Sequence, residues 1–319
     1  MIIMETSNPV FAPIPADLFV SKLPDGEKEF FCYIGFKNGA AEHAYRLSWS
    51  IRSTKTGDNF LIRGERSILQ KERDSCETTI SVLLSTAFET GELTVSLDHP
   101  SDHKTGSWKI MMYQQNGEFR LPLDGQVLVA SGHRIGEAHR SALRIPSQQF
   151  GWDLLPLCNN GLRLIKGILS DNLRSVDFEG FGQAVLAPAD GIVVKAVDGN
   201  PDLEYAGQLP EDIDYYVEDL VRATGNYVIL EHGNNVWSFL GHLRHGSVKV
   251  NEGKKVHVAD KLGELGNSGY SSGPHVLLHF MDGPNIFSAS PLPIELNLEG
   301  GVYSPQAGEI TSSNGLLHK

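Results

Sequence analysis

The 319-residue chain has few cysteines, no long apolar run and a shortage of basic side chains. Its three cysteines, Cys32, Cys76 and Cys158, are odd in number and lack the spacing of a metal or redox motif. We expect reduced thiols in a reducing compartment, and a Cys32–Cys76 disulfide is the alternative if the protein is exported. No apolar stretch reaches the roughly 18 residues that a transmembrane helix needs, so no membrane span is expected.

Acidic residues outnumber basic ones by 39 to 27, which gives a net charge of −12. Nucleic-acid binding depends on Lys and Arg side chains that neutralise phosphates, and anionic membranes or wall polymers attract basic surfaces. The charge therefore argues against both kinds of partner. The first residues, MIIMETSNPVFAPIPADLF, show no basic segment followed by a long apolar one. No secretory signal is visible, and a cytoplasmic location is favoured over export.

The length favours two domains, because single hydrophobic cores seldom grow beyond about 250–300 residues. Residues 1–122 contain short β-type runs at about ten-residue spacing, which is typical of a β-sandwich. The runs are FFCYIGF, YRLSWSIRST, ETTISVLL, ELTVSLD and SWKIMMY. This part holds no cluster of catalytic type, so binding or spacing is its expected role. Residues 123–147 are predicted to be a polar connector, 148–299 a second β-rich domain, and 300–319 a loosely packed polar tail.

The second domain contains five motifs in a fixed order. They are AVLAPADG (184–191), GNYVILEH (225–232), SFLGHLRHGSVKV (238–250), the glycine-spaced run 256–266, and GNSGYSSGPHVLLHFMD (266–282). In this order they resemble the lysostaphin-like (LytM-type) zinc endopeptidases. Several motifs in one order are far more specific than a single glycine-rich match. The resemblance implies a LytM-type, duplicated-hybrid-motif-like β-sheet domain, and a family that cleaves peptidoglycan peptides.

The resemblance also implies a catalytic site, in which the family uses three zinc ligands and two assisting histidines. The assisting histidines correspond to His242 and His275. The family's H-x-G-x-D pattern supplies two ligands, and it corresponds here to Gln149 through Asp153. The second histidine of its H-x-H pattern corresponds to Leu277. One ligand of three, Asp153, therefore remains.

Zinc chemistry needs more than this single carboxylate. A catalytic zinc takes three protein ligands and keeps a fourth position for water, whose pKa it lowers from 15.7 to about 7. Gln149 offers only a neutral amide oxygen, and Leu277 offers no donor at all. We therefore predict a degraded zinc site with no cofactor, and zinc only if the protein is an active enzyme after all.

Other histidines lie near these positions in the sequence. Alternate residues of a strand share a face, so His275, Leu277 and His279 are expected to point the same way. A two-residue bulge is the alternative register: it places His279 at the metal-binding position, but then Leu277 replaces a catalytic histidine and Gln149 stays unrepaired. His133 and His139 are an alternative source of the missing imidazole, but both are predicted to lie on the surface of the connector, since metal ligands need placement within tenths of an ångström.

The sequence as a whole predicts a mainly β protein, with an N-terminal sandwich and a C-terminal LytM-like domain. We expect a catalytically inactive homologue that binds an extended peptide or a protein partner in the old substrate groove, beside His242, His275 and the glycines Gly269 and Gly273. One alternative is an active zinc endopeptidase that uses Asp153, His279 and a third ligand not identified by sequence. A purely structural interaction protein is the other.

Overall fold

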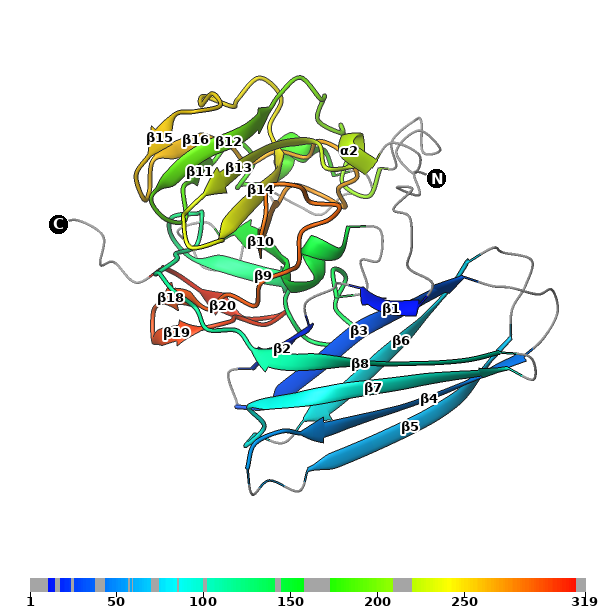
Figure 1. Ribbon diagram of the computed structural model, residues 1–319. Helices are drawn as coiled ribbons and strands as arrows, with labels where there is room; N and C mark the ends of the chain where they lie inside the picture. The colour runs from blue at the N-terminus through cyan, green and yellow to red at the C-terminus, as the bar shows by residue number, and fades with distance from the viewer. Residues whose placement is uncertain are drawn as a thin grey trace. The chain divides into compact units, whose positions relative to one another are not determined.

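The structure is a computed structural model, and it describes residues 11–14, 18–23, 26–37, 44–56, 58, 60–69, 75–84, 86–99, 102–140, 145–157, 173–208 and 220–313. The chain forms two compact units, one within residues 3–114 and one within residues 115–319 (Figure 1). Each unit is described by itself below.

The N-terminal unit is one eight-stranded sheet. Its strands are β1 (Phe11–Ile14), β2 (Leu18–Lys22), β3 (Lys28–Lys37), β4 (Ala44–Ser53), β5 (Leu61–Leu69), β6 (Ser75–Leu84), β7 (Thr90–His99) and β8 (Asp102–Met112). They pair in the order β1-β3-β2-β8-β7-β4-β5, and β6 pairs with the other edge of β3. All pairs are antiparallel except β2 with β8.

A single hydrophobic cluster joins the two ends of this strand order. Phe30 and Ile34 of β3 belong to the same buried cluster as Leu47 of β4 and Val95 of β7. A sheet whose distant strands share one core is sandwich-like. The five strands expected from sequence are β3, β4, β6, β7 and β8. Sequence reasoning missed β1, β2 and β5. Of these, β5 is an edge strand with many exposed polar side chains and an interior glycine, Gly64.

The structure describes the strand positions of two of the three cysteines. Cys32 is a buried free thiol and lies opposite Ile80 across the β3–β6 pair, whereas Cys76 lies opposite Phe36. The alternative Cys32–Cys76 disulfide is therefore wrong, because four residues of strand separate the two positions, about 13 Å. Cys158 lies outside the described residues.

The C-terminal unit is built on a second eight-stranded sheet. Its strands, in pairing order, are β15 (Lys255–Val256), β12 (Gly191–Val197), β13 (Asn226–Glu231), β14 (Trp237–Leu243), β17 (Val276–Met281), β10 (Trp152–Pro156), β9 (Val127–Ser131) and β20 (Ile310–Thr311). Two further pairs are β11 (Ala184–Leu186) with β16 (Lys261–Glu264), and β18 (Leu296–Leu298) with β19 (Gly301–Tyr303). The short helices are η1 (Pro146–Phe150), η2 (Ser175–Asp177) and α2 (Leu220–Ala223).

Both units are therefore mainly β, as expected from sequence. Within the described ranges, no helix is long and apolar enough to cross a membrane. The central strands β13, β14 and β17 are almost completely buried. All six residues of β17 are buried, which explains why its sequence is a nearly continuous apolar run rather than an alternating one.

Two segments differ from their expected roles. The predicted connector, residues 123–147, contributes β9, which pairs with β10 in the main sheet. The predicted polar tail, residues 300–319, contributes β19 and β20, which pair with β18 and β9. Strands this short carry too few residues for their periodicity to be read from sequence.

Candidate functional site

Neighbouring strands of the C-terminal sheet bring the predicted site residues together. Asp153 on β10 lies directly opposite Leu277 on β17, and Leu277 lies opposite Gly241 on β14. Cβ atoms of directly opposed residues are about 4.5–5.5 Å apart, so Asp153 and Leu277 share one face of the sheet. Over the described β14 and β17, the pairing runs from Trp237 to Gly241 without the two-residue bulge that the alternative register requires.

The Asp153 carboxylate accepts hydrogen bonds from two imidazoles. His139 Nε2 lies 2.7 Å from Asp153 Oδ1, and His275 Nε2 lies 3.2 Å from the same oxygen. Burial acts to raise the pKa of the Asp153 carboxyl, but the charges of His275 and His139 and their hydrogen bonds hold it well below its ordinary value. The carboxylate is therefore ionised over the physiological pH range.

His275 is the protonated partner in this contact. Its Nδ1 donates to the Gly273 carbonyl at 2.7 Å, so the ring presents donors on both sides. Burial acts to lower the pKa of His275, but the Asp153 charge, the hydrogen bond to Asp153 and the Gly273 carbonyl raise it above its ordinary value. Ser271 Oγ lies 3.2 Å from the same Nδ1 and 2.8 Å from the Gly273 carbonyl. Since Nδ1 carries a proton, it does not act as a base toward Ser271.

His242 is the neutral partner, and its backbone conformation directs it into the site. The residue has a φ of 60°, in the left-handed region, within β14 where the pairing with β13 shifts. Irregularities of this kind re-aim a side chain. Its Nδ1 donates to the Ser268 carbonyl at 2.8 Å, and its ring lies 4.8 Å from that of His275. Burial, followed by the charge of His275, lowers the pKa of His242 to about 3.

The glycines around Ser268 serve packing. A Cβ on Gly225 would lie 2.4 Å from the Ser268 carbonyl oxygen, and a Cβ on Gly269 would lie 2.5 Å from the Gly225 nitrogen. Both glycines also have positive φ, 68° and 79°. These close approaches hold the Ser268 carbonyl where His242 donates to it. Gly273 contributes its carbonyl to His275, so both predicted groove glycines lie at the site.

His139 does not lie on a connector surface, which was the position favoured from the sequence. Its side chain is only 17% exposed and reaches Asp153. It also packs over Gly151, where an added Cβ would lie 3.4 Å from His139 Cγ and 3.3 Å from a methyl group of Leu277. The charge of His139 further lowers the pKa values of His242 and His279, so it lies near both. No local spacing signals this, because the contact forms only once β9 and β10 pair.

His133 is not on a surface either. It is fully buried, and its ring stacks on Trp152 with centroids 4.1 Å apart. Burial, helped by the nearby Arg140 charge, lowers the pKa of His133 to about 3. It is therefore a neutral core histidine that fixes the start of the segment leading to His139.

Gln149, Leu277 and His279 are all buried. Leu277 is 2% exposed within an apolar cluster that includes Ile229 and Phe239. The Gln149 amide nitrogen is buried and, among the described residues, has no hydrogen-bond partner. The same holds for both ring nitrogens of His279. That ring stacks on Phe239 with centroids 4.8 Å apart, and burial, with a smaller contribution from His139, lowers its pKa to about 3.

A zinc ion does not fit this set of donors. Leu277 has no donor atom, and Asp153 Oδ1 already accepts from two imidazoles. In the part of the chain that the structure describes, no group of three or more His, Cys, Asp and Glu side chains is arranged to hold a metal ion. What the arrangement provides is hydrogen bonding: a carboxylate, a protonated imidazole, and a neutral imidazole whose Nε2 keeps its lone pair.

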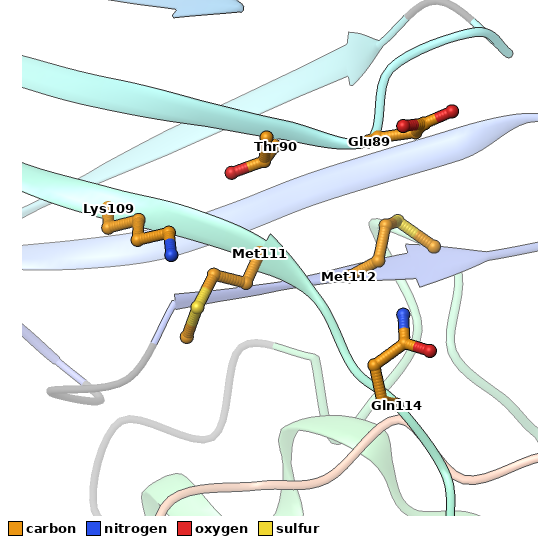
Figure 2. A pocket seen from close by; sticks show the side chains of 6 residues that line it. All are labelled: Glu89, Thr90, Lys109, Met111, Met112 and Gln114. Carbon is orange, nitrogen blue, oxygen red and sulfur yellow. The ribbon is translucent and has the colours of Figure 1, made fainter. Parts of the chain in front are cut away.

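A separate surface hollow of about 380 Å³ lies in the N-terminal unit. Figure 2 shows its lining residues, Glu89, Thr90, Lys109, Met111, Met112 and Gln114. Glu89 forms an ion pair with Lys55 at 2.5 Å, so this carboxylate already has a partner. None of the six residues belongs to the histidine site.

Comparisons with known proteins agree with the geometry of the C-terminal unit. Residues 172–286 match the model of peptidase family M23. An "uncharacterized metalloprotease" of Buchnera aphidicola subsp. Baizongia pistaciae (strain Bp) is 43% identical over 56 residues, which are 18% of this chain and 14% of that protein.

Solved structures show weaker overall similarity. The catalytic domain of lysostaphin from Staphylococcus simulans is 16% identical, with a TM-score of 0.29, over 53% of this chain and 88% of that one. A chain of the SpoIIIAH–SpoIIQ complex is 19% identical, with a TM-score of 0.32, over 55% and 96%. Because these TM-scores are low, the family of the C-terminal unit is assigned from the match to the family model and from the residues of the site.

Proposed function

Because this chain belongs to peptidase family M23, we propose that its C-terminal domain is a catalytically inactive member that binds an extended peptide or a protein partner. The observation that carries the proposal is the direct opposition of Leu277 and Asp153. Leu277 has no donor atom, and it lies across from Asp153, the one remaining ligand. Leu277 is also packed into an apolar cluster. The domain therefore lacks the ligands for the family's zinc, which would supply the activated water.

The retained groups suit binding. A neutral His242 offers an acceptor at Nε2, and a protonated His275 offers donors, which together match the donor and acceptor of a peptide amide. An extended chain laid along a sheet takes its affinity from backbone hydrogen bonds and its selectivity from side-chain pockets. Tyr270, which follows Gly269 in the sequence and is 51% exposed, offers an aromatic surface to a bound chain.

An active zinc endopeptidase acting on peptidoglycan peptides is the second candidate, and one observation favours it. His139 supplies an imidazole beside Asp153, so it is a candidate third ligand in a set with Asp153 and His279. The His279 ring, however, is fully buried against Phe239. A structural interaction protein with no groove ligand is the third candidate.

A peptide titration separates groove binding from the structural alternative. We expect wall-type and other extended peptides to shift the His242 and His275 ring resonances in NMR spectra, with dissociation constants on the order of micromolar to millimolar. The variant His242→Ala removes the acceptor and is expected to weaken binding about tenfold. The exposed His257 provides the matched control, since His257→Ala leaves the groove unchanged.

The structural alternative predicts the opposite result. In that case no peptide shifts either ring, and His242→Ala leaves every partner interaction intact.

A further inference from the structure

The segment that carries His139 lies between two buried anchors. His133 stacks on Trp152 at one end, and the fully buried Arg140 lies over the Phe150 ring at 4.3 Å at the other. Residues 134–139 between them are half-buried or exposed, and Gly136 has a φ of 99° within this turn. We call residues 134–139 the cap. The cap is held by a buried residue at each end, whereas its own residues are half-buried or exposed.

One hydrogen bond links the cap to the site. His139 Nε2 and His275 Nε2 contact the same carboxylate oxygen, so the two rings are neighbours around Asp153 Oδ1. The side chains of His139 and Asp153 are 17% and 18% exposed, whereas that of His275 is 7% exposed. His139 is therefore the more exposed of the two imidazoles on Asp153, and His242 lies next to His275.

We propose that the cap closes the groove, and that His139 is the latch that holds it over Asp153, His275 and His242. An incoming chain competes with His139 for the Asp153 carboxylate and must move the side chain outward. The movement needs no change at the anchors, because His133 and Arg140 are held by separate aromatic contacts. Gly151 leaves the space in which the His139 ring packs. The groove is then open only while the latch is released.

Histidine labelling tests the cap directly. Diethyl pyrocarbonate modifies accessible, unprotonated imidazoles, and peptide mass spectrometry gives a rate for each histidine at about pH 8. In the full chain, we expect the neutral His242 to react slowly, and His275, which is protonated, is not used as a probe. The variant His139→Ala is expected to speed the reaction of His242 about tenfold, the effect of losing a hydrogen bond to a charged group.

Two further histidines and a conservative variant show whether faster labelling comes from opening of the cap or from unfolding. His133 and His279 are fully buried and should stay protected in His139→Ala, since only unfolding exposes them. The variant His139→Gln keeps an N–H donor at the reach of Nε2 and should restore slow labelling.

The cap is refuted if His242 reacts as slowly in His139→Ala as in the wild type. It is also refuted if His133 and His279 become reactive together with His242, or if His139→Gln behaves like His139→Ala. The cap proposal rests on the proposed function in one respect: it takes a groove ligand to be the molecule that displaces His139. The labelling rates depend neither on peptide binding nor on metal, so the two proposals fail separately.

Discussion

Histidines introduced together at positions 149 and 277 give the protein a zinc site that neither gives alone. In Gln149→His with Leu277→His, an imidazole stands directly opposite Asp153, and the second ligand of the family's H-x-G-x-D pattern returns. Three protein ligands are what a catalytic zinc requires. We expect zinc affinity to rise at least about a hundredfold over the wild type, equivalent to about 2.7 kcal/mol. Titration against a competing chelator measures it.

The single substitutions supply the controls. Leu277→His alone places an imidazole in an apolar cluster at a 2% exposed position, and it should cost about 2–4 kcal/mol of unfolding free energy. Leu277→Met, which conserves volume, should cost less than about 1.5 kcal/mol. Zinc should recover stability in the double variant but not in Leu277→His. Equal zinc affinity in the wild type and the double variant would show that position 277 does not face the site.

Removing the Asp153 carboxylate destabilises the domain strongly. His139 and His275 both donate to it, and the Asp153 side chain is only 18% exposed. Breaking a buried charge pair typically costs about 3–5 kcal/mol, and we expect Asp153→Ala to lower the unfolding free energy by this amount. Asp153→Asn keeps an oxygen acceptor and should lose less. Denaturant unfolding near neutral pH measures both, and a loss below about 1 kcal/mol in Asp153→Ala would contradict the ion pair.

The pH dependence of this loss follows from the two pKa shifts. The native pKa of Asp153 lies below its ordinary 3.8, so its contribution is fully present above 3.8 and is lost as the pH falls through the native value. The native pKa of His275 lies above 6.5, so its contribution is fully present below 6.5 and is lost as the pH rises through the native value. The stability difference between wild type and Asp153→Ala should therefore be largest between these two ordinary values.

Sequence predicted the parts of the site that lie in local motifs. Asp153, His242 and His275 each belong to a short pattern with a fixed backbone geometry, and the structure brings all three together. The opposition of Leu277 and Asp153 agrees with the ungapped alignment of the H-x-H segment.

Sequence did not predict the parts that depend on contacts between distant segments. His139 follows β9 in the chain, and it reaches Asp153 because β9 pairs with β10, which carries Asp153. Its sequence neighbours are polar, and they hide the burial of His133 and Arg140 against Trp152 and Phe150. A polar segment folded onto aromatic rings has no hydrophobic period, so reading it as a surface connector was the natural error.

The most direct test of the account is the zinc content of the wild-type protein, purified without chelators and measured by elemental analysis alongside its hydrolysis of peptidoglycan peptides. Since Leu277 and Gln149 occupy two of the three ligand positions, we expect well under one zinc per chain and no cleavage. One tightly held zinc per chain, with hydrolysis that Asp153→Ala abolishes, would contradict the account and establish the domain as an active peptidase with a different set of ligands.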